Sequence, residues 1–301
     1  MCNDPTTQLT SPKKGNRALL YLIIGAIAIG FAPVFVRLSE LGPIATGFWR
    51  VAIAFPLLTA LSIGKGTTYP AKLARPNYQD YLWLLFSGII FGCDLATWHV
   101  SIHYTTIANS TLLANFSPVL LALWGWLVLG KPLQKKPMFG LGLAIMGVVL
   151  LINPGLSINK ATLIGDSLAF STAFFYAGYL LVLNRARKKF TAFTSMSIST
   201  FSSMLTLLAI SLLSKENLLP SSQTAWLILL ALALFAHILG QGLIAYALPY
   251  LSVTFASTAL LVQPMVAAIA GWFFFTETLS GLQMLGMLVA LVGIFLAKQT
   301  S

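Results

Sequence analysis

Long apolar segments alternate with short polar ones along the whole chain of 301 residues. A helix needs about 20 consecutive apolar residues to cross the hydrocarbon core of a bilayer. That length predicts ten transmembrane helices, and turn residues such as Asn153-Pro154-Gly155 separate most of them. They are expected at residues 18–37, 43–63, 81–103, 107–129, 137–153, 163–184, 194–214, 225–247, 253–275 and 281–297. Residues 1–17 form a polar tail, and no connection is long enough for a soluble domain.

The composition agrees with this pattern. Of all residues, 57% are hydrophobic and 8% are charged, whereas a soluble domain has about 25% charged residues. The chain is therefore predicted to be an all-α integral membrane protein, with the lipid bilayer as its partner. The net charge of +11 does not indicate nucleic-acid binding, because the basic residues form short clusters between apolar segments, as in cytoplasmic loops.

The positions of Lys and Arg predict the orientation. With the N-terminus in the cytoplasm, fourteen of them fall in cytoplasmic segments, against Arg37, Lys160 and Lys215 outside; Arg50 lies within a span. Cytoplasmic loops carry the excess of basic residues in most membrane proteins. We therefore expect a multi-pass protein of the cytoplasmic membrane with both termini in the cytoplasm.

One segment of the chain occurs twice. Residues Ser110–Leu150 align with Ser257–Leu296, without a gap from Pro118 and Pro264 onward, and ten of those 33 positions are identical. The hairpin loop is basic in the first copy, KPLQKKP, and acidic or neutral in the second, ETLSGLQ. The charge difference predicts that the two loops lie on opposite sides of the membrane.

This repeat divides the spans into five and five, at residues 18–153 and 163–297. Because five is odd, the second half must enter the membrane from the opposite side. Inverted repeats of this kind are typical of secondary transporters, which bind substrate near the midplane between the halves. The prediction is two inverted five-helix repeats around a central cavity. The cavity binds a small molecule, which the protein transports by alternating access.

A membrane-embedded acyl-transfer enzyme that uses His99 and Asp94 is an alternative of another class. It is disfavoured, because these residues are five positions apart, about 140° around a helix. A Walker lysine loop, a dinucleotide glycine fingerprint and a zinc pair are absent from the sequence. We therefore expect no enzymatic activity, no cofactor and no metal.

The chain resembles the EamA-type ten-helix exporters of the drug/metabolite transporter superfamily. The resemblance rests on the two hairpins, on Pro43–Arg50 at the start of the second span and on Gly165-Asp166 at the start of the sixth. It implies that four helices of each half surround the path while the fifth and tenth are peripheral. It also implies an exporter of amino acids or related metabolites. An uptake carrier for a nucleoside-like or vitamin-like solute is the alternative.

Asp94 is the acid that lies well inside a span, in the third. Charges at this depth normally face a cavity or a partner, so Asp94 is a candidate for substrate binding and proton coupling. The alternative is a hydrogen bond that joins helices, to Asn109, Asn115 or Gln241. His99 is the second candidate for both roles, because histidine titrates near physiological pH.

Uncharged groups complete the expected substrate site. Asn115 and Gln263 lie beside Pro118 and Pro264, which remove a backbone donor and are candidate hinges. The other candidates for substrate binding are Asn109, Gln241, which the repeat aligns with Asp94, and the aromatic residues Trp98 and Tyr176. For the polar groups, the alternative is hydrogen bonding between helices.

Two arginines and a pattern of small residues are expected to have structural roles. Arg37 and Arg50 are expected near the outer face, extended toward the interface or paired with Glu40, with capture of an anionic group as the alternative. Small residues follow one face of the fifth and tenth spans, around Ala144 and Ala290, and permit close helix approach. These faces pack within the chain or form a homodimer surface.

Overall fold

The computed structural model describes residues 12–64, 76–128, 130, 135–151, 160–187, 189–251, 256, 259–278 and 280–297. Most of the expected N-terminal tail, most of the connection at 64–80, part of the first hairpin loop and the link between the halves lie outside the described residues. All regular secondary structure in the described part is helical. The fold is therefore all-α, as predicted.

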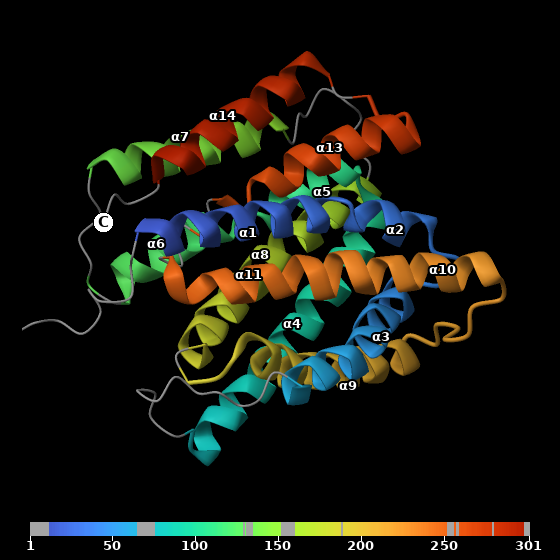
Figure 1. Cartoon of the computed structure of the whole chain (residues 1–301). Coiled ribbons are helices and arrows are strands. Elements are labelled where there is room, and N and C mark those ends of the chain that lie inside the picture. Colours follow the sequence, from blue (N-terminus) through green and yellow to red (C-terminus); the bar gives the residue numbers. More distant parts are fainter. Residues whose placement is uncertain are drawn as a thin grey trace, which may run out of the picture.

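The helices follow the expected order (Figure 1). The first half contains α1 (Pro12–Gly30), α2 (Ala32–Leu38), α3 (Pro43–Gly64), α4 (Tyr78–Tyr104), α5 (Ile107–Ala114), α6 (Ser117–Leu127) and α7 (Lys135–Leu151). The second contains α8 (Lys160–Ala186), α9 (Ala192–Leu213), α10 (Gln223–Ala231), η2 (Leu232–Gln241), α11 (Gly242–Ala247), η3 (Leu248–Tyr250), α13 (Val262–Phe275) and α14 (Gly281–Ala297).

Seven helical segments within the described residues are long and apolar enough to cross a membrane, and α7, α13 and α14 belong to shorter apolar helices. Some expected spans consist of consecutive helices, such as α1 with α2 and α5 with α6. The expected ninth span, 253–275, is described as a helix only from Val262 onward, because most residues just before it lie outside the described part.

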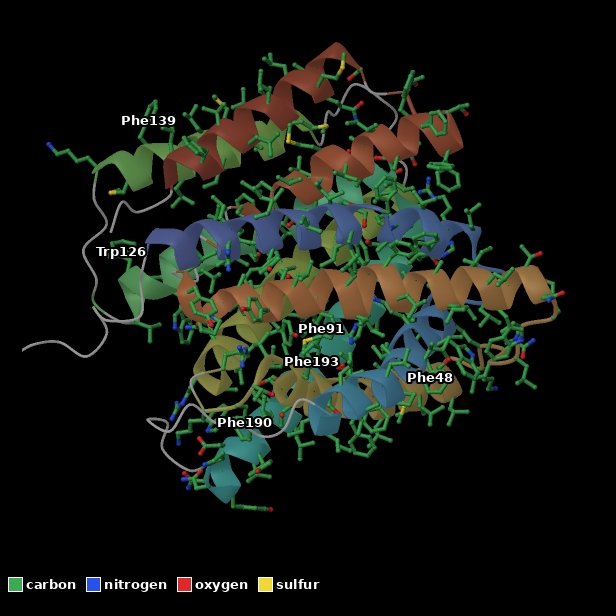
Figure 2. All side chains as sticks on the ribbon, viewed as in Figure 1. Phe48, Phe91, Trp126, Phe139, Phe190 and Phe193 are labelled. Atoms are coloured by element: carbon green, nitrogen blue, oxygen red, sulfur yellow. The ribbon has the colours of Figure 1, made fainter. Side chains whose placement is uncertain are left out.

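Large apolar side chains lie on the outside of the bundle as well as inside it (Figure 2). Phe91 is buried and stacks on Tyr179 with 4.5 Å between ring centroids. Phe139 and Trp126, in contrast, are 65% and 44% exposed. Apolar surface on this scale is unusual for a protein in water and is expected of helices that face lipid.

Helices α7 and α14 lie side by side at one edge of the bundle, where their small residues meet (Figure 1). A Cβ atom on Gly147 would overlap the backbone of Ala290, and one on Gly293 would overlap the backbone of Ala144. The small-residue faces are thus occupied by each other within one chain. They are not a free surface for a second copy, so a homodimer through another face stays a prediction.

The fourth span is interrupted near the centre of the bundle. Helix α5 ends at Ala114, and α6 begins at Ser117 with Pro118 in its first turn. Proline is tolerated there because its missing N–H has no partner within the helix at that position. Helix α13 likewise has Pro264 in its first turn. Interrupted helices of this kind form the binding sites of many secondary transporters.

Two neighbouring segments also depart from a regular α-helix. The first span breaks at Phe31, between α1 and α2, with Pro33 just after the break. The eighth span contains η2, a π-helix of 10 residues that ends at Gln241. Such π-helical segments occur often at functional sites.

Candidate substrate site

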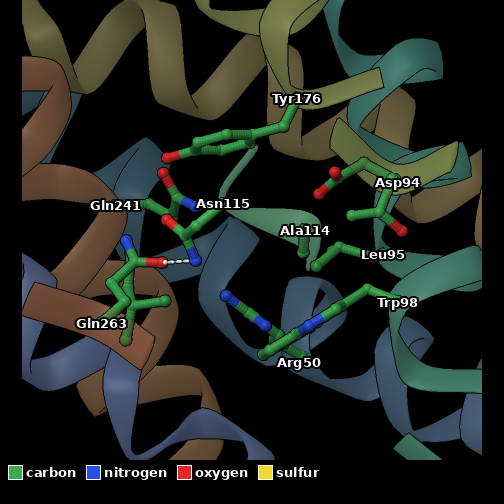
Figure 3. A pocket seen from close by; sticks show the side chains of 11 residues that line it. Arg50, Asp94, Leu95, Trp98, Ala114, Asn115, Tyr176, Gln241 and Gln263 are labelled. Atoms are coloured by element: carbon green, nitrogen blue, oxygen red, sulfur yellow. Dashed lines mark hydrogen bonds between the residues drawn. The ribbon is translucent and has the colours of Figure 1, made fainter. Parts of the chain in front are cut away.

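A buried cavity lies where these irregular segments meet (Figure 3). Both halves contribute to its lining, and the peripheral helices α7 and α14 do not. The lining residues are Ile29, Arg50, Asp94, Leu95, Trp98, Ala114, Asn115, Thr172, Tyr176, Gln241 and Gln263. Its volume is about 40 Å³, which is enough for water but far below the roughly 300–1,000 Å³ of a typical small-molecule pocket.

Two opposite charges face this cavity from different helices. Arg50 on α3 is 1% exposed and Asp94 on α4 is 5% exposed. No ion pair joins them in the described part of the chain, where Arg50 Nε and Asp94 Oδ1 also lack a hydrogen-bond partner. Buried charges are normally paired, because an isolated one is strongly disfavoured. The cavity therefore presents a guanidinium and a carboxyl group that are not paired with each other, and each has one polar atom without a partner.

His99 contacts Arg50 and is not itself among the residues that line the cavity. His99 Nδ1 lies 3.0 Å from the carbonyl oxygen of Pro43, and Nε2 lies 3.5 Å from Arg50 Nη1. A carbonyl only accepts and a guanidinium only donates. Nδ1 must then carry the proton and Nε2 must be the acceptor, which makes His99 a neutral imidazole. The Arg50 guanidinium also lies 5.9 Å from the centroid of the Trp98 ring, within the range of a cation–π contact.

An amide pair joins the two halves at one wall of the cavity. Asn115 Nδ2 donates to Gln263 Oε1 at 3.2 Å and to the carbonyl of Thr111 at 2.9 Å. Gln263 Nε2 has no partner among the described residues. In Figure 3, the Tyr176 hydroxyl lies on the same side as the Gln241 amide. This wall offers neutral donors and acceptors next to the two charges.

The structure brings together six of the eight expected substrate-binding residues. Asp94, Trp98, Asn115, Tyr176, Gln241 and Gln263 line the cavity. His99 does not line it but lies behind Arg50, and Asn109 lies in the first turn of α5, away from the cavity. Pro118 and Pro264 are not in the lining and begin the helices beside it. Their roles in transport stay predictions.

Both arginines differ from the prediction: Arg37 pairs with Glu277 and not with Glu40, and Arg50 lies deeper than predicted. Arg50 was expected near the outer face, extended toward the interface or paired with Glu40, but it is buried at the cavity. Glu40 instead accepts hydrogen bonds from Ser221 and Ser222. The signal was present in the sequence: a basic residue within an apolar span usually faces a cavity or a partner. Thr172, which also lines the cavity, carried no signal of this kind.

Comparison with known proteins adds a family to this geometry. Residues 16–153 match the sequence pattern of the EamA-like transporter family, and residues 163–298 match the same pattern a second time. The chain belongs to this family. This EamA protein is therefore a multi-pass membrane transporter of the drug/metabolite superfamily, and its helices follow the ten-helix, two-repeat architecture of the family.

Several curated proteins are similar to this EamA transporter over most of their length. An uncharacterized transporter of Archaeoglobus fulgidus is 27% identical, covering 93% of this chain and 97% of that protein. A probable amino-acid metabolite efflux pump of Salmonella typhimurium is 24% identical, covering 95% of each. The threonine/homoserine exporter of Salmonella typhimurium is 25% identical, covering 85% of this chain and 87% of the exporter.

A solved structure has the same fold. A protein crystal structure superimposes with a TM-score of 0.64 at 15% sequence identity, covering 93% of this chain and 98% of that one. The arrangement of helices in this EamA transporter is therefore shared with a protein of very different sequence.

Proposed function

We propose that this transporter exports a small zwitterionic metabolite of the amino-acid class across the cytoplasmic membrane, and that it acts as a carrier and not as an enzyme. One observation carries the proposal: Arg50 and Asp94 face one buried cavity and make no ion pair with each other among the described residues. Both termini lie in the cytoplasm in this proposal, as the distribution of Lys and Arg predicts.

A zwitterion matches both charges of the cavity. Its carboxylate can accept two parallel hydrogen bonds from the Arg50 guanidinium, and its ammonium group can donate to Asp94. A neutral solute would leave both buried charges unpaired, and a polyanion would face Asp94. The names of two relatives, an amino-acid metabolite efflux pump and a threonine/homoserine exporter, support both the solute class and export.

Substrate entry requires a change of conformation. The cavity volume of about 40 Å³ is too small for an amino acid, so the helices around it must separate before binding. The breaks beside Pro118 and Pro264 provide hinges, because the backbone there lacks continuous helical hydrogen bonding. Alternating access then consists of opening this cavity first to one side and then to the other.

Asp94 is the proposed site of proton exchange. In an exporter, the ammonium group of the substrate and a proton from outside would occupy the Asp94 carboxylate in turn, so that inward proton flow drives outward transport. His99 is not part of this exchange, because both of its ring nitrogens already face fixed partners, the Pro43 carbonyl and Arg50. We assign it to the positioning of Arg50.

The experiment is ligand binding by purified protein, read as a rise in thermal stability, since a ligand of the folded state alone stabilises it. Neutral α-amino acids are compared with their amides, which lack the carboxylate, and with their N-acetyl derivatives, which lack the ammonium group. We expect stabilisation by the parent amino acids alone. Equal stabilisation by the amides and N-acetyl derivatives contradicts the proposal. Phe139→Leu, a change on the lipid-facing surface, is the control variant.

A further inference from the structure

The short turn between α4 and α5, at Thr105 and Thr106, is held by three other parts of the chain. We infer that this turn is the outer gate of the cavity and that the ion pair of Arg37 with Glu277 is its latch. The inference rests on alternating access as proposed above, and the charge distribution of the sequence predicts that this end of the bundle faces outside. Figure 1 shows α2 and the end of α13 together at this end.

Arg37, at the end of α2, holds the first side of the turn. Its Nη2 donates to the carbonyl oxygens of Ile102 at 2.7 Å and Thr105 at 2.9 Å. These carbonyls belong to the last turn of α4 and its C-cap, where a helix presents partial negative charge. The guanidinium also lies 5.3 Å from the centroid of the Phe275 ring. Arg37 therefore ties the end of α4 to the first span and to α13.

Glu277, just after α13, holds the second side. Its carboxylate pairs with Arg37 Nη1 and accepts from the backbone N–H of Ile107 at 3.1 and 3.2 Å. Ile107 is the first residue of α5, where a helix presents partial positive charge. Arg37 thus faces the partial negative charge at the end of α4. Glu277 faces the partial positive charge at the start of α5. Charge-assisted hydrogen bonds of this kind are stronger than neutral ones.

The third contact comes from the second half of the chain. The hydroxyl of Thr105 donates to Asp166 Oδ1 on α8 at 2.7 Å. The turn is therefore fixed by α2 from its own half and by α8 and the α13–α14 connection from the other half. A movement between the halves would break the contacts of Glu277 and Asp166 with the turn and separate Arg37 from Glu277, whereas the bonds from Arg37 to Ile102 and Thr105 lie within the first half.

The turn is mechanically connected to the cavity. Helix α4 carries Asp94 and Trp98, and Trp98 lies seven residues before Thr105, about 10 Å along the helix. Helix α5 is eight residues long and ends at Ala114 beside Asn115. A shift of the turn away from Arg37 and Glu277 would therefore move two walls of the cavity. With its small cavity and its intact ion pair of Arg37 with Glu277, the structure represents the state in which the cavity is closed at this end.

The test measures access to the cavity from outside. Ala114, which lines the cavity, is replaced by cysteine in a background with Cys2→Ser and Cys93→Ser. Intact cells are treated with a membrane-impermeant thiol reagent. We expect slow labelling with the latch intact and about tenfold faster labelling in Arg37→Gln or Glu277→Gln, since loss of one charged hydrogen bond changes an equilibrium by about this factor. The double variant should label no faster than the faster single one.

Glu40→Gln is the matched control, because Glu40 binds Ser221 and Ser222 at the same end without touching the turn. It should label as slowly as the parent protein. Thr105→Val, which removes only the bond to Asp166, replaces the latch variants if these do not fold, and it should also accelerate labelling. Unchanged labelling in the folded latch variants and Thr105→Val, or equal acceleration by Glu40→Gln, overturns the inference. The labelling experiment needs no substrate. A failure of amino-acid binding would therefore contradict the proposed function but not the inference that this turn is the outer gate.

Discussion

The side-chain amide of Asn115 donates to the side-chain amide of Gln263 at 3.2 Å. Asn115 lies at the break between α5 and α6, and Gln263 lies in the first turn of α13. The break in the fourth span and the first turn of α13 thus contact each other through unlike residues, at the wall of the cavity. Symmetry between the repeats determines where the helices break, and the difference between the repeats determines which groups face a substrate.

This amide pair should contribute modestly to stability. In a cycle of Asn115→Ala, Gln263→Ala and the double variant, we expect a coupling energy of about 0.6 kcal/mol, the average for hydrogen bonds between membrane helices. Denaturation of purified protein in detergent measures it. A coupling energy near zero would show that the bond is not formed in the dominant state.

Arg50 should bind the substrate through its shape as well as its charge. Arg50→Gln should weaken amino-acid binding by roughly ten- to hundredfold, the loss expected for a hydrogen bond to a charged group. Arg50→Lys keeps the charge but lacks the planar fork, so we expect it to bind more weakly than the parent protein. Titration calorimetry with a neutral α-amino acid distinguishes these cases, and parent-like affinity in Arg50→Gln contradicts the assignment.

His99 should act through Arg50. Glutamine can donate to the Pro43 carbonyl and accept from Arg50, as the neutral imidazole does, whereas alanine can do neither. His99→Ala should therefore weaken substrate binding, and His99→Gln should largely restore it with the same pH profile as the parent. A pH profile that changes in His99→Gln would instead assign a titrating role to this histidine.

Asp94 should connect transport to the proton gradient. In vesicles with an imposed pH gradient, flux through the parent protein should respond to the gradient. Flux through Asp94→Asn should be slower and should not respond to the pH gradient, because a side-chain amide does not take up or release a proton near neutral pH. If Asp94→Asn transports at the parent rate across pH, or if parent flux ignores the gradient, proton exchange at Asp94 is excluded.

The contact of α7 with α14 should matter for stability and not for binding. In Gly293→Ala the new methyl group would overlap the backbone of Ala144, and overpacking of this kind destabilises by about 1–3 kcal/mol. Gly142→Ala, on α7, meets no atom of the described chain within 4 Å and should be neutral or slightly stabilising, since alanine favours the helix. Thermal unfolding measures both, and substrate affinity should be unchanged in each.

The spans were predictable because the bilayer imposes a minimum length on every apolar segment. The breaks at Pro118 and Pro264 were predictable as well, because proline cannot continue a helix without loss of a hydrogen bond. The partners of the charged groups were not. Glu277 is 240 positions from Arg37 in the sequence, and nothing in the local pattern indicates that they meet.

The depth of Arg50 was difficult for a related reason. Its position close to one end of an apolar segment permits either an interfacial or a buried side chain, and the choice depends on what the neighbouring helices offer. Here His99 and Trp98 on α4 provide an acceptor and an aromatic face. Information of this kind becomes available only when α3 and α4 are placed side by side.

The close packing of α7 against α14 has a consequence for how proteins of this fold diversify. The contact requires only that Gly147 and Gly293 have no side chain, whereas the cavity depends on the individual chemistry of Arg50, Asp94 and their neighbours. Changes at well-separated sites combine almost independently. Cavity residues can therefore be replaced one at a time, with a change of solute, while Gly147 and Gly293 keep the contact of α7 with α14 in place.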